Sequence, residues 1–394
     1  MDLPRNVVEL LQALIAIPSV NPEGDGETGT SHLGEAACAQ YVADFLRVCG
    51  ARVVMEEVEL GRPNVIARFG GEGDVSAQKT RLLFAPHLDT VSVAGMTIDP
   101  FAGELREEKI WGRGASDTKG TMAAMLWAFY ELKERMTELE VEVGFVGLMG
   151  EEIAQPGSRH FAQHHGAEWD FAIVGEPTEL KTVCRHKGCT WVKLVTKGKA
   201  AHGSTPERGE NAIMRMNEVL RDLGRGFMRE LQQLVFKNEF LGHPTLNIGT
   251  MQGGSKTNIV PDHCEVTLDF RETPELAAAG GVAKLLPVYF EEKFAAGSFP
   301  KVEVEMLSEC PALDTPEDHF FVKHLAALGA EPVGAPWLCD ATWLAKAGIA
   351  SVALGPGSIA QAHTEDEYLE VEALQEGVVF YRKIMEEFRA AKVD

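Results

Sequence analysis

Residues 143–158, VGFVGLMGEEIAQPGS, decide the fold, because an apolar run ends there in a glycine and two acids before a helical pattern begins. We predict a strand over Glu142–Met149 and a helix over Ser158–His165. The same order recurs on both sides, with strands at Asn64–Phe69, Arg81–Ala85 and Phe171–Val174 and a helix at Lys119–Arg135. Such alternation predicts an α/β domain with a mixed, mostly parallel sheet flanked by helices. Because these sheets carry their chemistry at the carboxyl ends of the strands, polar residues directly after each apolar run are the candidate site residues.

The alternation of strands and helices changes near Thr182 and resumes beyond Asp314. The residues between predict a βαββαβ order typical of a separate α+β domain, with elements near Cys189–Thr196, Glu210–Asp222, Thr245–Gln252, Cys264–Arg271, Pro274–Lys293 and Lys301–Met306. The α/β pattern resumes with a helix at Ala341–Ala347, a strand at Ser351–Leu354 and a C-terminal helix from Glu370. We therefore expect one domain built from residues 1–181 and 308–394, interrupted by an inserted domain over residues 182–307.

The length and charge of the chain limit the classes of function. At 394 residues the chain exceeds the roughly 250 to 300 residues at which a single core stops growing, so more than one domain is expected. Its 37 Lys and Arg against 59 Asp and Glu give a net charge of −22, which opposes binding to nucleic acid and to anionic membranes. An acidic total is typical of a soluble surface, and carboxylates gathered around metal cations are the alternative.

The cysteines and apolar segments indicate a cytoplasmic protein. Seven scattered cysteines without a C-x-x-C pair argue against a disulfide framework or a cysteine zinc site and favour a reducing compartment. The apolar stretch Val7–Ile17 is interrupted by polar residues and predicts an amphipathic helix. No run reaches the ~18 apolar residues of a membrane span. The Gly-rich, charged segment Gly70–Lys79 is a predicted surface loop.

His87 and Asp89 end the strand in LLFAPHLDT, residues 82–90. Side chains two apart on a strand leave the same face. Asp89 can therefore accept one ring N–H of His87 and present the other nitrogen to a metal. A surface pair, or a histidine satisfied in the core, is the alternative.

Asp117 lies in a glycine-rich turn, IWGRGASDTKGTMAAML, residues 110–126. A carboxylate at a strand-to-helix junction can reach into the crevice and bridge two cations. Capping of the following helix is the alternative function of Asp117. A phosphate-binding loop is not indicated, because this segment lacks the required glycine spacing and the Lys-Ser/Thr that should follow.

Glu151 and Glu152 are consecutive carboxylates after an apolar strand. Burying two acids is costly unless cations or protons compensate. Adjacent residues point to opposite sides, so one can ligate a metal while the other acts as a base. A solvated pair in a loop is the alternative.

Glu176 in FAIVGEPTE and His363 in SVALGPGSIAQAHTEDEYLE also follow predicted strand ends. Together with the residues above they converge at the edge of one sheet. The negative charges of three carboxylates and a hydroxide balance the positive charges of two divalent cations, and two imidazoles complete the coordination shells of the cations. Imidazole with carboxylate suits Zn²⁺, with Co²⁺ or Mn²⁺ as substitutes, in a catalytic site.

Six motifs in this order, over nearly the whole chain, resemble one family: PHLDTV, GRGASDTKG, MGEE, GEPT, KGKAAHGSTPERGENAI and GPGSIAQAHTEDEY. They are similar to the dinuclear zinc aminoacylases and carboxypeptidases, which include acetylornithine deacetylase, succinyl-diaminopimelate desuccinylase and glutamate carboxypeptidase. The resemblance implies a catalytic α/β domain interrupted by a ferredoxin-like lid domain through which members dimerise, so a homodimer is expected.

The resemblance also assigns roles to the candidate residues. Asp117 becomes the bridging ligand, with His87 and Glu176 on one metal and Glu152 and His363 on the other. It makes Glu151 the acid/base of amide hydrolysis and Asp89 the acid that orients His87.

The lid residues carry further expectations from the same resemblance. His202 matches a histidine that reaches a neighbouring active site in dimeric relatives and stabilises the oxyanion, with a structural turn histidine as the alternative. Asn258 and Arg271 match residues that contact the substrate carboxylate, although Arg271 in a surface ion pair remains an alternative. Backbone donors from Gly355 to Ser358 are a further candidate for substrate binding.

The expected activity is hydrolysis of small N-acyl amino acids, with an acetylornithine-like substrate leading. Desuccinylase, dipeptidase or glutamate carboxypeptidase activity is the alternative. A nucleotide-binding enzyme is disfavoured because the phosphate-binding residues are absent. A non-catalytic metal- or peptide-binding relative is disfavoured by the presence of Glu151.

Overall fold

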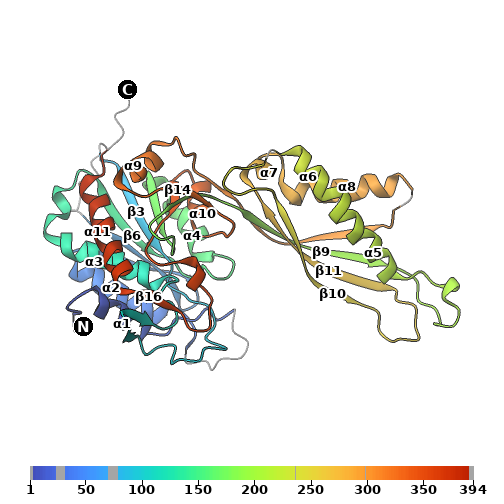
Figure 1. The fold of residues 1–394 in the computed structure, drawn as a ribbon, viewed down its shortest axis with the longest axis horizontal. Coiled ribbons are helices and arrows are strands. Elements are labelled where there is room, and N and C mark those ends of the chain that lie inside the picture. Colours follow the sequence, from blue (N-terminus) through green and yellow to red (C-terminus); the bar gives the residue numbers. More distant parts are fainter. Residues whose placement is uncertain (1–2, 24–31, 70–78, 236, 298, 390–394) are drawn as a thin grey trace. The chain divides into compact units, whose positions relative to one another are not determined.

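The computed structural model describes residues 3–23, 32–69, 79–235, 237–297 and 299–389. The chain divides into two compact units (Figure 1). The first comprises residues 1–184, 315–333 and 339–394, and the second comprises residues 185–314 and 334–338. The predicted loop Gly70–Lys79 lies outside the described residues, apart from its last residue.

A mixed sheet, with nine strands among the described residues, forms the centre of the α/β architecture. Its order is β1-β2-β6-β3-β7-β15-β8-β13, with β14 paired to β8. The strands are β1 (Arg52–Glu59), β2 (Arg62–Arg68), β3 (Arg81–Pro86), β6 (Glu142–Gly147), β7 (Phe171–Gly175), β8 (Thr182–His186), β13 (Leu313–Asp314), β14 (Pro332–Ala335) and β15 (Ala350–Ala353). The central strands β6, β3, β7 and β15 run parallel, and β1, β2, β8 and β13 pair antiparallel. The predicted fold class is confirmed.

The register of the central strands brings their carboxyl ends to one line. Phe84 of β3 lies opposite Phe145 of β6 and Ile173 of β7. Pro86 lies opposite Gly175, so the next residue on each of these two strands leaves the sheet at the same level. The strands are buried almost throughout, which explains why they read as continuous apolar runs without alternation.

Helices flank this sheet, and a small sheet lies beside it. The helices are α1 (Val7–Ile15), α2 (Ala36–Val48), α3 (Lys119–Leu132), α4 (Pro156–His165), α9 (Phe320–Leu328), α10 (Ala341–Lys346) and α11 (Val371–Glu387). The small sheet contains β4 (Glu104–Arg106), β5 (Lys109–Trp111) and β16 (Tyr368–Glu370). The helix predicted over Lys119–Arg135 is α-helical to Leu132 and continues as a 3₁₀ turn to Glu138. Among the described residues, no helix has the length and apolar character needed to cross a membrane.

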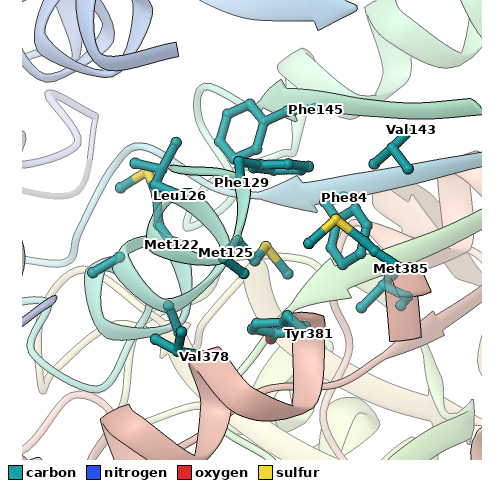
Figure 2. Packing of buried hydrophobic residues seen from close by; sticks show 14 of the residues in the cluster. Phe84, Met122, Met125, Leu126, Phe129, Val143, Phe145, Val378, Tyr381 and Met385 are labelled. Carbon is teal, nitrogen blue, oxygen red and sulfur yellow. The ribbon is translucent and has the colours of Figure 1, made fainter. Parts of the chain in front are cut away.

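Aromatic side chains hold α3 and α11 against the sheet (Figure 2). Phe84 makes edge-to-face contacts with Phe129 at 5.4 Å and with Tyr381 at 5.7 Å between ring centroids. Phe129 also meets Phe145 at 6.1 Å. The Tyr381 hydroxyl donates to the carbonyl of Leu354 at 2.7 Å, so the buried hydroxyl is satisfied. This core gives the strand ends a rigid base.

The second unit contains a four-stranded antiparallel sheet in the order β10-β11-β9-β12. Its elements are β9 (Gly188–Lys197), α5 (Ala212–Asp222), α6 (Met228–Leu234), β10 (Thr245–Gly253), β11 (His263–Glu272), α7 (Pro274–Ala278), α8 (Gly281–Ala295) and β12 (Val302–Cys310). Apolar residues of β9 and β11 alternate into a core beneath the helices. The single helix predicted over Pro274–Lys293 is wrong, because Gly280 and Gly281 take positive φ angles of 115° and 69° and separate α7 from α8.

The second unit differs from the expected insertion, residues 182–307, at both ends. Thr182–Cys184 group with the first unit, where Val183 pairs with Ala353 of β15. At the other end β12 continues to Cys310, which lies opposite Cys189. A lid or dimerisation role for this unit remains a prediction.

Candidate active site

His87 stands directly after β3 and is 2% exposed. Its Nδ1 lies 2.9 Å from the backbone carbonyl of Asp89 and 3.5 Å from the Asp89 carboxylate. Its Nε2 lies 3.0 Å from Asp117 Oδ1. The carbonyl, more than the expected carboxylate, therefore orients the ring so that Nε2 faces the centre of the site.

The Asp89 carboxylate has a different set of partners. It accepts the backbone N–H of Glu151 at 3.0 Å and of Glu152 at 3.1 Å, and the Asn21 amide at 2.8 Å. Asp89 is fully buried. It thus fixes the turn that carries the two glutamates, as well as adjoining His87.

Asp117 is placed between two histidines. Its Oδ1 faces His87 Nε2, and its Oδ2 lies 3.5 Å from His363 Nε2. The N-cap of α3 is Thr118, and the cap has no side-chain hydrogen bond. The helix-capping alternative is not supported, and the two carboxylate oxygens point to different groups, as a bridging ligand requires.

Glu152, Glu176 and His363 complete two clusters. Glu152 Oε2 lies 3.1 Å from His363 Nε2. Ligand atoms of His87, Asp117 and Glu176 lie within 4.8 Å of one another, as do those of Asp117, Glu152 and His363. Asp117 belongs to both clusters. All five residues that the sequence identified as candidate ligands are therefore brought together.

The clusters carry more negative charge than the protein can stabilise alone. Burial, reinforced by Asp117, raises the pKa of Glu152 to about 7 and that of Glu176 well above its ordinary value. Burial also opposes charge on His87, but Asp117 and Asp89 outweigh it and raise its pKa well above the usual range. Oε1 of Glu152 and Oε1 of Glu176 are buried without a hydrogen-bond partner among the described residues. Divalent cations at these two positions would satisfy both the charge and the orphaned oxygens, so the donor set fits a pair of metals.

Glu151 is not a member of either ligand cluster. Its Oε1 accepts a hydrogen bond of 2.9 Å from the Gln155 amide. Burial and the neighbouring Glu176 raise its pKa well above the ordinary value. A carboxyl group with a raised pKa, beside a candidate metal cluster and not committed to it, suits acid/base chemistry.

Gly355 and Ser358 are committed to local structure. The Gly355 N–H donates to the Thr178 hydroxyl at 3.1 Å, and the Ser358 hydroxyl donates to Glu179 at 3.0 Å. Contacts with a substrate would require these two groups to exchange partners.

His202, Asn258 and Arg271 lie in the second unit. His202 and Asn258 are neighbours, because His202 pairs with Ile259 and the Gly203 N–H donates to the Asn258 carbonyl. Arg271 is opposite Cys189 at the start of β9, whereas the His202 turn follows the end of that ten-residue strand. Some eight residue steps at ~3.3 Å separate the two ends of the sheet. The unit therefore does not bring Arg271 together with the other two, and Arg271 pairs with Asp269 at 2.9 Å.

Most of the chain matches a known protein family. Residues 83–387 match the family model for peptidase family M20/M25/M40. The chain belongs to this family. It is therefore an enzyme of the metallopeptidase and deacetylase class, and the predicted family is confirmed.

Curated relatives of this M20/M25/M40 member include two acetylornithine deacetylases. That of Proteus mirabilis is 30% identical over 98% of this chain and 97% of its own length. That of Vibrio vulnificus is 31% identical over 98% of this chain and 100% of its own length.

Solved structures of M20 proteins share the fold. The metallo-carboxypeptidase Sso-CP2 of Sulfolobus solfataricus has a TM-score of 0.74 at 21% identity, covering 97% of this chain and 99% of its own. The YXEP protein of Bacillus subtilis, described as a dinuclear metal binding peptidase, has a TM-score of 0.68 at 17% identity, covering 96% of each chain.

Two acidic residues near the candidate ligands, Glu367 and Asp340, were not predicted from the sequence. Glu367 is buried and accepts the backbone N–H groups of Gly114, Ser116 and Asp117 at 2.7–2.9 Å and the Arg113 guanidinium at 2.9 Å. It links the loop of the candidate bridging ligand to the His363 segment. In the sequence it is the last of three consecutive acids, and nothing distinguishes it from the two before it.

Asp340 is the second missed residue. It is 1% exposed, accepts the Ser158 hydroxyl, and has Oδ2 buried without a partner among the described residues. Burial raises its pKa to about 7. An acid directly before the helix predicted at Ala341 resembles Asp117 in its position, so a sequence signal was present.

Proposed function

We propose that this protein hydrolyses the amide bond of small N-acyl amino acids with two bound divalent cations, acetylornithine-like substrates being the leading choice. The observation that carries the proposal is the pair of His, Asp and Glu clusters that share Asp117, with Glu151 beside them. Curated relatives named acetylornithine deacetylase, similar over nearly their whole length, support the substrate class.

In this proposal His87 and Glu176 hold one cation, Glu152 and His363 hold the other, and Asp117 contacts both. The donors are imidazole and carboxylate without thiolate, which suits Zn²⁺ in a catalytic site, with Co²⁺ or Mn²⁺ as substitutes. Such cations polarise a carbonyl and lower the pKa of water.

Glu151 performs the proton transfers. Its free oxygen takes a proton from the attacking water and returns it to the leaving amine as the C–N bond breaks. Asp89 supports this role by holding the backbone N–H of Glu151. Because the Gln155 amide donates to Oε1 of Glu151, whereas Glu152 contacts His363, the two glutamates can act differently.

Substrate binding is assigned to residues of both units. Arg271 supplies a cation for the substrate carboxylate, and Asn258 and His202 supply polar contacts at the other end of their sheet. Because these two ends are far apart, we propose that they serve different active sites in a homodimer, with His202 acting in its partner. Gly355 and Ser358 are weaker candidates, since their polar groups already have partners.

A hydrolysis screen tests the proposal. The zinc- and cobalt-loaded protein is assayed against N-acetyl, N-succinyl, glutamyl and dipeptide substrates, with EDTA-treated protein as the control. We expect the fastest turnover with N-acetyl amino acids, N-acetylornithine first. Preference for N-succinyl, dipeptide or glutamyl substrates would replace the acyl group or substrate in the proposal, and no hydrolysis by metal-loaded protein would contradict it altogether.

A further inference from the structure

A chain of side-chain hydrogen bonds reaches Glu151 from two helices of the first unit. The Trp343 indole N–H, on α10, donates to Gln155 Oε1 at 2.9 Å. The Gln155 amide, at the start of α4, donates from Nε2 to Glu151 Oε1 at 2.9 Å. Neither Gln155 nor Trp343 belongs to the clusters that hold the cations in the proposed function.

The backbone of Gln155 is held firmly. The residue is 4% exposed and adopts a left-handed conformation with φ 54° directly before Pro156. Its N–H donates to the Gly150 carbonyl at 3.1 Å, and its own carbonyl accepts from the Ser158 hydroxyl. A non-glycine residue in this conformation costs energy that the surroundings must offset. The side chain therefore starts from a fixed point.

The indole determines which end of the Gln155 amide faces Glu151. An indole N–H can only donate, so it requires the amide oxygen on its side. The amide NH₂ is then directed to the other side, where it donates to Glu151. The Trp343 ring also contacts two positively charged side chains, with Arg159 at 4.8 Å and Lys346 at 5.2 Å from its centroid.

We propose that Gln155 is a positioning residue for Glu151 and that Trp343 sets the direction in which its amide acts. The inference rests on the proposed function, in which Glu151 moves the proton. The amide ties Oε1 as an acceptor, so Oε2 is the oxygen that takes the proton of the attacking water while the new C–O bond forms. The same oxygen gives that proton to the nitrogen when the C–N bond breaks. A fixed carboxylate avoids the loss of rate that follows from a mobile base.

Two substitutions test the kinetic consequence. Gln155→Leu removes the donor at similar size, and Trp343→Phe removes the indole N–H while keeping a smaller aromatic ring. We expect kcat to fall about ten- to a hundredfold, as for loss of a hydrogen bond to a charged group, with KM and zinc content unchanged. Gln163→Leu on the exposed face of α4 is the matched control for the first substitution. Trp127→Phe, whose N–H bonds only to the exposed Glu131 at 3.0 Å, is the control for the second. Unchanged kcat in both test variants, or an equal loss in the controls, would overturn the proposal.

A second measurement does not depend on activity. The protein has six tryptophans, so a spectrum of ¹⁵N-labelled indole groups is simple, and the signal missing in Trp343→Phe identifies Trp343. We expect Gln155→Leu and Glu151→Ala each to shift this signal, in the metal-free and in the zinc-loaded protein. A signal that both variants leave in place would show that the hydrogen-bond chain does not exist. If wild-type protein hydrolyses none of the substrates, the proposed function fails, and this spectrum still decides whether Trp343, Gln155 and Glu151 are linked by hydrogen bonds.

Discussion

At the scale of single residues, Glu151 and Glu152 are neighbours in sequence with different surroundings. Glu152 faces His363 at 3.1 Å, and Glu151 faces the Gln155 amide at 2.9 Å. We expect Glu151→Ala to lower kcat by about 10²- to 10⁴-fold, the usual contribution of acid–base catalysis, while metal content and folding persist. Glu152→Ala should lose metal occupancy as well, because it removes a proposed ligand. Metal analysis and steady-state kinetics on the best substrate measure both, and full activity of Glu151→Ala would mean that another group moves the proton.

The raised pKa values predict how pH acts on the metal-free protein. Burial raises the pKa of Glu152 from 4.5 to about 7, so between these values the folded state keeps a proton that the unfolded state has lost. The free energy of unfolding therefore falls as pH rises through this window. Cations replace the proton, so zinc should raise the melting temperature more at pH 8 than at pH 5.5.

Thermal melts of EDTA-treated and zinc-loaded protein between pH 5 and 8 measure this effect. Glu152→Gln is the matched control, because it should flatten the pH dependence of the metal-free protein. A zinc effect that is equal at both pH values would contradict the predicted exchange of protons for cations.

The candidate ligands that the structure brings together include three that follow strand ends. His87, Glu152 and Glu176 were found because an apolar run stops directly before the segment that carries each of them. Glu367 was not found, since its partner Arg113 lies far away in the chain. Gln155 was not found, since Trp343, which orients its amide, is equally distant and a short-range pattern does not reveal it. Arg271 was grouped with Asn258 only by motif, and the register of β9 and β11 places them apart.

At the scale of elements, Glu367 ties β16 and the His363 segment to the loop before α3. Glu367→Gln would replace one acceptor oxygen by an NH₂ group that faces backbone donors and would leave Arg113 buried without its charged partner. We expect metal affinity to fall about 10- to 100-fold and the free energy of unfolding to fall by about 3–5 kcal/mol.

Isothermal titration with zinc and urea unfolding measure these two effects. Glu370→Gln serves as the control, because that side chain is 58% exposed and lies 3.9 Å from Lys109. Unchanged metal affinity in Glu367→Gln would show that the loop holds Asp117 without this carboxylate.

The prediction of elements succeeded where apolar runs are buried on both faces and failed where tertiary contacts decide. β1 was not predicted, since it is an edge strand with much of its side-chain surface exposed. The helix α2 was also not predicted. The division of α7 from α8 depends on two glycines whose φ angles are a property of the folded chain. Strand β12 extends four residues beyond its predicted end because it pairs with β9 from Thr196 to Cys189.

At the scale of the whole molecule, the positions of His202 and Arg271 at opposite ends of one sheet lead to a prediction about assembly. If His202 acts in a partner's site, Glu151→Ala and His202→Ala are each defective alone but complement one another in a mixed dimer. One of the two sites in each mixed dimer is intact, so random exchange of subunits should restore about a quarter of wild-type turnover. Light scattering measures whether the protein is a dimer. Assays after co-refolding or co-expression of the two variants measure the recovery of turnover. Simple averaging of the two defective activities would place His202 in its own active site or outside catalysis.

The division into units has a consequence for biosynthesis. His363, β15 and α11 belong to the first unit but follow residues 185–314 in the chain. Translation runs from the N-terminus, and domains fold as they emerge. The second unit is therefore nearly complete on the ribosome while β7 still lacks its partner β15 and α3 still lacks α11. Until the final helix emerges, the nascent first unit exposes the face of Phe84 that Tyr381 covers in the folded protein. This is the interval in which the growing chain most needs the protection of a chaperone.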